Sequence, residues 1–317
     1  MTRIGLFTPA SPIEAVALKS GVAKIESAGL SVKIHNQALS EDFIYAGDDA
    51  TRVGALWDLA IDDEIDVLWC SRGGYGCSRM LPLLDELTAK HGPPPRKLLV
   101  GYSDVTVLHH YAQTRWAWPT LHANMPATSS METMPDDQFQ ATVKLVQGEW
   151  HDVVGPLFGL EPMRFFGSAP TKPVTAPLLG GNLATWNYLT GTPYQPGDLA
   201  RKFLFFEDIG EGFHKIDGYF TQLSQAGGLD GIAGLILGGF HDCLDSSSKA
   251  KSAQGGYTEE ESLEGITTQL GQRHGFPVAW KLPVTHGPDY WPLPLNADYR
   301  LDPDGRLTLT KWDWLSG

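Results

Sequence analysis

The sequence predicts an α/β protein whose first half forms a doubly wound parallel sheet and whose second half forms a smaller, β-rich domain of mixed α and β structure. Short apolar runs alternate with helical patterns in the first half, and such strand–helix–strand units pair their strands in parallel through right-handed crossovers. The chain has 317 residues, which at about 150 residues per domain indicates two domains. Its 42% hydrophobic and 19% charged residues are an ordinary globular composition.

Four apolar runs are the predicted strands of the first half, and they cover residues 4–7, 32–34, 67–70 and 98–100. Between them, apolar residues recur at helical spacing, namely Leu18, Val22 and Ile25, then Val53, Leu56, Ala60 and Ile61. Residues 1–155 are therefore predicted to form a flavodoxin-like domain with helices on both faces of its sheet.

The pattern changes between residues 156 and 176, where Gly and Pro recur without a sustained period, and we predict a linker there. Residues 177–317 are predicted to form the C-terminal domain. Its expected strands lie at 202–206 and 232–237, with helical patterns at 216–223 and 263–270. Near the C-terminus, Asp304-Gly305 is a turn signal between two short strands.

Charge and cysteine content restrict the partners and the compartment. The net charge of −13 disfavours nucleic acid and the anionic membrane surface as partners. No run of about 18 apolar residues is present, and the N-terminus is a poor secretory signal. Three cysteines are too few for a disulfide framework, so we expect a reducing, cytoplasmic location.

A candidate nucleophile follows the predicted strand at 98–100. Gly101-Tyr102-Ser103-Asp104 is a strand end, a sharp turn carrying a hydroxyl, and the start of a helix. This arrangement raises a serine oxygen above the sheet, as in a nucleophile elbow, although the second glycine of G-x-S-x-G is missing. Ser103 or Asp104 as a simple helix cap is the competing interpretation.

A glycine-rich loop, Gly73-Gly74-Tyr75-Gly76, follows the predicted strand at 67–70. It lacks the third glycine of a dinucleotide fingerprint and the Gly-Lys-Ser/Thr of a phosphate loop. Because glycine lets another group approach the main chain closely, a backbone amide donor is the better interpretation.

A serine nucleophile needs a base, and the base needs an orienting group. Glu207 lies just past an apolar strand, where it can orient an imidazole. His286 is one of ten histidines and lies in a turn-rich loop, where a solvent-exposed histidine is the competing interpretation.

Metal sites are not indicated. Cys70 and Cys77 form no C-x-x-C pair, and His109 and His110 are adjacent instead of four residues apart. We therefore predict neither a metal nor a cofactor.

Five segments together resemble the LD-carboxypeptidase family of serine peptidases, the muramoyltetrapeptide carboxypeptidases of bacterial cell-wall recycling. In chain order they are SRGGYGCSRML, GYSDVTVLH, PLLGGNLATWNYLTGTP, FLFFEDIGEGFHKIDGYFTQL and PVTHGPDYWPLPL. The resemblance runs from residue 5 to about residue 295, which is nearly the full length. Two departures flank the predicted site, Thr285 and Asn296, where the family commonly has glycine.

The resemblance implies a triad in which Ser103 is the nucleophile, His286 the general base and Glu207 the orienting acid. It further implies an oxyanion hole made by the backbone N–H groups of Gly74 and Asp104, and a homodimer. The implied reaction is hydrolysis of an L,D amide bond that releases D-alanine from a murein tetrapeptide. A self-immunity peptidase acting on peptidyl- or aminoacyl-nucleotide antibiotics of the microcin C type is the alternative, and a binding module with a disabled site is a third.

Overall fold

The computed structural model describes residues 2–153, 157–244, 257–287 and 289–315, and the chain divides into two units. The first unit comprises residues 1–150, 291–295 and 313–317, and the second comprises residues 151–290 and 296–312. Two short segments of the domain predicted over 177–317, residues 291–295 and 313–317, therefore belong to the first unit. Both are held by long-range contacts: residues 293–295 join the first sheet, and Trp314 Nε1 donates a 3.1 Å hydrogen bond to the Val146 carbonyl.

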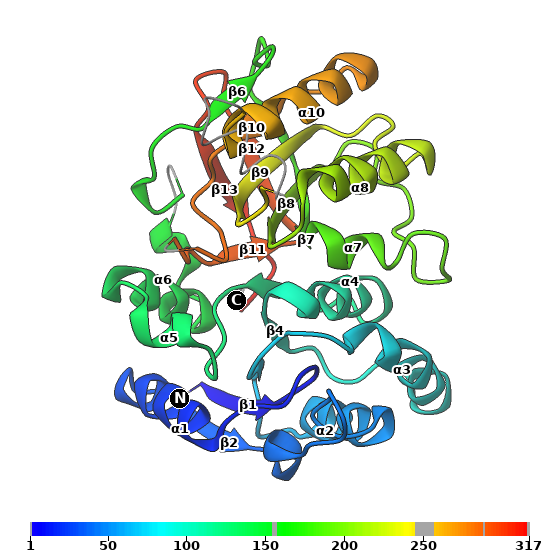
Figure 1. Ribbon diagram of the computed structural model, residues 1–317. Helices are drawn as coiled ribbons and strands as arrows, with labels where there is room; N and C mark the ends of the chain where they lie inside the picture. The colour runs from blue at the N-terminus through cyan, green and yellow to red at the C-terminus, as the bar shows by residue number, and fades with distance from the viewer. Residues whose placement is uncertain (1, 154–156, 245–256, 288, 316–317) are drawn as a thin grey trace. The chain divides into compact units, whose positions relative to one another are not determined.

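The first unit is built on a six-stranded sheet with the order β11-β5-β4-β3-β1-β2 (Figure 1). Strands β1 to β5 are parallel in the flavodoxin-like order 2-1-3-4-5, and β11 is antiparallel to β5. The parallel class predicted from the sequence is confirmed. The strands are β1 (Arg3–Phe7), β2 (Ser31–Ile34), β3 (Val67–Cys70), β4 (Leu98–Gly101), β5 (Thr120–His122) and β11 (Leu293–Leu295).

Helices lie on both faces of this sheet. Helix α1 contacts α5, and α3 contacts both α2 and α4. The two groups lie on opposite faces of the sheet, as right-handed crossovers require (Figure 1). Asp48 begins α2 by accepting a 2.7 Å hydrogen bond from the Thr51 amide. The helical elements are α1 (Ala15–Ser27), η1 (Asn36–Leu39), α2 (Asp49–Ile61), α3 (Cys77–His91), η2 (Ser103–Val105), α4 (Thr106–Arg115), α5 (Ser129–Thr133) and α6 (Asp136–Val146). A short helix, η3 (Trp150–Val153), begins at the last residue of the segment 1–150 and continues into the second unit.

The second unit is built on a seven-stranded sheet with the order β13-β12-β7-β8-β9-β10-β6. Its four central strands, β7 to β10, are parallel, and its outer strands are antiparallel. Strand β6 lies inside the stretch 156–176 that was predicted as a linker; prolines and glycines around it obscure its three-residue pattern. The strands are β6 (Arg164–Phe166), β7 (Val174–Asn182), β8 (Phe203–Ile209), β9 (Gly234–His241), β10 (Val278–Trp280), β12 (Ala297–Leu301) and β13 (Leu307–Lys311).

Helices α8 and α10 lie alongside the strands of the second sheet (Figure 1). Apolar side chains of these helices form a buried core with side chains of β8, β9 and β10. Ile216, Phe220 and Leu223 of α8 and Leu263 and Leu270 of α10 belong to this core, at the spacing seen in the sequence. Thr258 and Glu261 cap α10 reciprocally. The helical elements are η4 (Leu157–Gly159), α7 (Leu183–Asn187), α8 (Phe213–Gln225) and α10 (Glu259–His274).

Within the described ranges, none of the helices combines the length and the apolar character needed to span a bilayer.

His109 of α4 is 1% exposed, and burial lowers its pKa to about 3. The unfolded chain takes up a proton on this imidazole below about pH 6.5, whereas the folded chain does not. His109 should therefore destabilise the protein as the pH falls, by about 2 kcal/mol at about pH 5. Urea unfolding of wild type and His109→Phe at pH 7.5 and 5 measures the difference, with His91→Phe on the surface as the control. Equal pH dependence in wild type and His109→Phe would contradict the prediction.

Candidate active site

Ser103 lies in the turn between β4 and α4, in a left-handed backbone conformation with φ of 62°. Non-glycine residues rarely adopt this conformation, which costs energy and clusters at functional sites. Neither η2 nor α4 has a side-chain cap, so the interpretation of Ser103 as a helix cap fails. Its hydroxyl makes no hydrogen bond to another described residue of the first unit. The turn presents a partly exposed, strained serine, as a nucleophile elbow does.

The glycine-rich loop packs directly against this serine. A methyl group on Gly73 would lie 3.0 Å from Ser103 Cβ, 3.3 Å from Ser103 Oγ and 3.4 Å from the Asp104 nitrogen. Glycine at position 73 therefore lets the loop approach the Ser103 turn closely. Among the described residues of the first unit, none accepts a hydrogen bond from the N–H of Gly74 or Asp104. The oxyanion hole that the resemblance implies for these two amides stays a prediction.

The Asp104 side chain holds the glycine-rich loop in place. It is 1% exposed, and its Oδ2 accepts a 2.7 Å hydrogen bond from the Cys77 amide at the start of α3. Burial raises the pKa of this carboxyl, while the amides of Cys77 and Gly76 and the charge of Arg52 oppose the rise. Asp104 therefore caps the helix that follows the loop, and not its own helix.

Arg52 is a site-supporting residue that the sequence analysis missed. Its side chain is fully buried, and Nη1 donates to the carbonyls of Pro9 at 2.6 Å and Gly76 at 2.9 Å. Nε donates to Gly47, and the guanidinium pairs with Asp49. Arg52 thus joins the loops that follow β1 and β3. A single arginine within an amphipathic helix pattern gives no signal of this role in one sequence.

The second unit brings Glu207 and His286 together. Glu207 lies in β8 and is fully buried, and its Oε2 is hydrogen bonded to His286 Nδ1. Burial lowers the pKa of His286, but the charge and hydrogen bond of Glu207, with the charge of Asp208, outweigh it, so the pKa is raised overall. The side chain of His286 is only 10% exposed, so the competing interpretation of a solvent-exposed histidine fails. The pair has the geometry of an imidazole oriented by a carboxylate.

Two glycines of β9 make room for the segment that carries His286. The β8–β9 register shifts between Phe206 and Asp208, so that Gly238 and Gly239 lie opposite Glu207. The segment before His286 runs along this bulge, with hydrogen bonds from Leu282 N to the Leu237 carbonyl and from Gly239 N to the Val284 carbonyl.

Thr285, one of the two departures noted in the sequence, organises the turn around His286. Its Oγ1 accepts a 2.7 Å hydrogen bond from the Gly287 amide and donates a 3.1 Å hydrogen bond to the Asp289 carbonyl. Its own amide donates to the same carbonyl at 3.0 Å. A threonine at this position therefore stabilises the turn through its hydroxyl, which glycine lacks.

Asp208, the acidic neighbour of Glu207, has different partners. Its carboxylate accepts hydrogen bonds from Asn182 Nδ2 and the Ala184 amide, both at 2.9 Å, at the start of α7. Burial, followed by the charge of Glu207, raises its pKa to about 6. Adjacent positions on the strand thus direct the two carboxylates to different partners, and only Glu207 is bonded to His286.

Substitution of Gly238 by alanine should displace the segment before His286. The added methyl group would lie 2.3 Å from the Val284 carbonyl oxygen and 3.1 Å from Glu207 Cβ. A shift of about 1 Å in a catalytic group costs on the order of 10²-fold in rate, so kcat should fall by about 10- to 100-fold. Steady-state kinetics and a thermal melt measure this, with Gly218→Ala on α8, where a methyl group meets no atom within 4 Å, as control. An unchanged kcat in Gly238→Ala would show that the His286 segment tolerates the methyl group.

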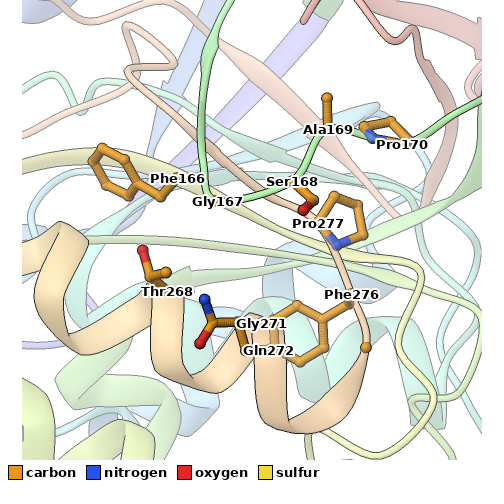
Figure 2. A pocket seen from close by; sticks show the side chains of 11 residues that line it. Phe166, Gly167, Ser168, Ala169, Pro170, Thr268, Gly271, Gln272, Phe276 and Pro277 are labelled. Carbon is orange, nitrogen blue, oxygen red and sulfur yellow. The ribbon is translucent and has the colours of Figure 1, made fainter.

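A separate cavity of about 340 Å³ lies in the second unit, between the segment after β6 and the C-terminal end of α10 (Figure 2). Thr268 and Gln272 of α10 point toward Gly167 and Ser168, and Phe276 contributes an apolar wall. Neither Glu207 nor His286 lines this cavity, so it is separate from the candidate site.

Among the described residues, no three or more His, Cys, Asp or Glu side chains are grouped so that they could hold a metal ion. Cys70, Cys77 and Cys243 are buried free thiols.

Comparison with known proteins gives consistent matches along the chain. Residues 4–123 match the LD-carboxypeptidase N-terminal domain, and residues 175–301 match the LD-carboxypeptidase C-terminal domain. A Streptomyces coelicolor protein whose name describes a carboxypeptidase is 33% identical over 98% of this chain and 93% of its own length. The murein tetrapeptide carboxypeptidase of Pseudomonas aeruginosa is 27% identical over 93% of this chain and 92% of its own.

Among solved structures, the microcin C7 self-immunity protein MccF in complex with aspartyl sulfamoyl adenosine has a TM-score of 0.80. It is 20% identical in sequence, and the match covers 99% of this chain and 97% of that chain. This likeness concerns the fold. The two domain matches and the relative with 33% identity show that the chain belongs to the LD-carboxypeptidase family.

Proposed function

We propose that the protein is a serine-type LD-carboxypeptidase that releases the terminal D-alanine of a murein tetrapeptide in the cytoplasm. The observation that carries this proposal is the strained turn at Ser103, where the hydroxyl faces Gly73 and the neighbouring amides of Gly74 and Asp104 have no described acceptor in their own unit. The buried Glu207–His286 pair supports it, because such a pair is the partner that an activated serine requires.

In the proposed mechanism, Ser103 Oγ attacks the carbonyl carbon of the amide bond between the L-configured centre of diaminopimelate and D-alanine. His286 accepts the hydroxyl proton, and Glu207 holds Nδ1 and stabilises the imidazolium. The N–H groups of Gly74 and Asp104 donate to the oxyanion. His286 then protonates the leaving amine, D-alanine departs, and water hydrolyses the acyl-enzyme with His286 again as base.

A self-immunity peptidase that cleaves aminoacyl- or peptidyl-nucleotide antibiotics is the alternative, because MccF shares the fold and was solved in complex with aspartyl sulfamoyl adenosine. Acylation of a serine serves both reactions. The two functions differ in the leaving group, a D-amino acid in one case and a nucleotide-bearing amine or sulfamate in the other.

The test is a comparison of kcat/KM for two substrates on one preparation. D-alanine release from the murein tetrapeptide is followed with a D-amino acid oxidase assay, and loss of aspartyl sulfamoyl adenosine is followed by chromatography. We expect the tetrapeptide to be preferred, and a tetrapeptide ending in L-alanine to be a poor substrate. Preference for the sulfamoyl adenosine would support the alternative, and no hydrolysis of either substrate would overturn both.

A further inference from the structure

Arg72 lies two residues beyond the carboxyl end of β3. It directly precedes Gly73, where a methyl group would lie 3.0 Å from Ser103 Cβ. Arg72 itself is exposed, and its Nη1 donates a 3.0 Å hydrogen bond to the Pro12 carbonyl. The guanidinium is therefore tethered to the loop after β1, and its other N–H groups donate to no other residue in the part of the chain that the structure describes.

Arg72 also differs from the other arginines of the first unit in having no ion-pair partner among the described residues. The other arginines of the first unit each form an ion pair with an aspartate or glutamate, and they are Arg3, Arg52, Arg79, Arg96 and Arg115. No described carboxylate lies within 4.0 Å of the Arg72 guanidinium. In a chain with a net charge of −13, an arginine without an acidic partner is available to an anionic ligand.

The position of Arg72 in the sheet is where such a ligand is expected. The strand order 2-1-3-4-5 reverses direction between β1 and β3, and ligands of open α/β sheets bind outside the carboxyl ends of the strands at such a point. The hydrogen bond from Arg72 to Pro12 joins the loops of these two strands. The same loops are joined by the hydrogen bond from Ser11 N to the Gly73 carbonyl, at 3.2 Å. The guanidinium thus lies at the carboxyl edge of the sheet, one residue before the glycine that packs against Ser103.

We propose that Arg72 binds the free carboxylate of the substrate's terminal residue. This inference rests on the proposed function, since an enzyme that removes one terminal residue must distinguish a carboxylate from a continuing peptide bond. Guanidinium binds carboxylate through two parallel N–H···O hydrogen bonds, which a lysine cannot reproduce. Because Gly73 follows Arg72 directly and packs against Ser103, the guanidinium and the nucleophile belong to neighbouring loops.

The experiment compares two substrates that differ only at the terminal group, the murein tetrapeptide and the same peptide with a C-terminal carboxamide. We expect Arg72→Gln to lower kcat/KM for the free acid by about 10- to 100-fold, chiefly through KM, because a charge-assisted hydrogen bond is lost. The carboxamide, which wild type should cleave poorly, should change by less than about threefold. Arg72→Lys should fall between, and Arg115→Gln on α4, an arginine paired with Asp85, should match wild type for both substrates.

The outcomes separate the inference from the proposed function. Wild-type protein that releases no D-alanine from the tetrapeptide overturns the proposed function, and the inference with it. Active wild type with equal losses on acid and carboxamide in Arg72→Gln shows that Arg72 merely supports the loop. Active wild type with unchanged kinetics in Arg72→Gln removes Arg72 from substrate binding while leaving the proposed function intact.

Discussion

Replacement of Ser103 by alanine is expected to lower kcat for D-alanine release by about 10⁴-fold or more while the protein keeps its fold. The rate falls because no other group can take the place of the nucleophile. The fold survives because alanine keeps the Cβ at this left-handed position, and the lost hydroxyl has no hydrogen bond within the described first unit. Thermal melts of wild type and variant should differ by only a few degrees.

The matched control is Ser27→Ala, which removes an exposed hydroxyl from α1. Both variants are assayed by D-alanine release, after their folding has been checked by circular dichroism and gel filtration. If folded Ser103→Ala turns over within tenfold of wild type, Ser103 is not the nucleophile.

Replacement of Glu207 by glutamine is expected to lower kcat by about 10²- to 10⁴-fold and to change KM much less. Glutamine keeps the shape of the side chain but cannot balance the positive charge of the imidazolium. A pH profile separates this role from a structural one. The wild-type rate should fall as the pH drops through the raised pKa of His286, because only the neutral imidazole accepts the proton. Without the Glu207 charge, burial should move this limb to lower pH.

Asp208→Asn is the matched control, since Asp208 adjoins Glu207 on β8 and holds Asn182 and the start of α7. Its kcat should change by less than about tenfold, and its pH limb should move less than that of Glu207→Gln. If Asp208→Asn loses most of its activity while Glu207→Gln keeps the wild-type rate, the carboxylate that orients His286 has been assigned to the wrong residue.

The doubly wound class of the first unit could be predicted because it depends on local periodicity. Short apolar runs separated by helical spacing leave few alternatives to parallel strands with crossover helices. Strand β11 could not be predicted in the same way, because its place beside β5 depends on pairing between residues about 170 positions apart. Strand β6 has only three residues, and the prolines and glycines around it resemble a linker.

The candidate site likewise contains residues that local sequence patterns predict and residues that only long-range contacts reveal. The sequence placed Ser103 at a strand end and Glu207 just past an apolar run, and both positions follow from periodicity. Arg52, by contrast, is buried and donates hydrogen bonds to three carbonyls from separate loops. No local sequence pattern reveals these contacts. In the sequence, Gly238 and Gly239 look like ordinary strand residues. Their position in the bulge opposite Glu207 shows that they make room for the segment before His286.

Covalent labelling with a fluorophosphonate, followed by peptide mass mapping, tests the role of Ser103 most directly. Such a reagent reacts with a serine that a neighbouring base activates. We expect one label per chain, located on Ser103, with D-alanine release lost in proportion to labelling, and much slower labelling in Glu207→Gln. Complete loss of D-alanine release with Ser103 unmodified, or full modification of Ser103 with release unchanged, would contradict a mechanism in which Ser103 is acylated.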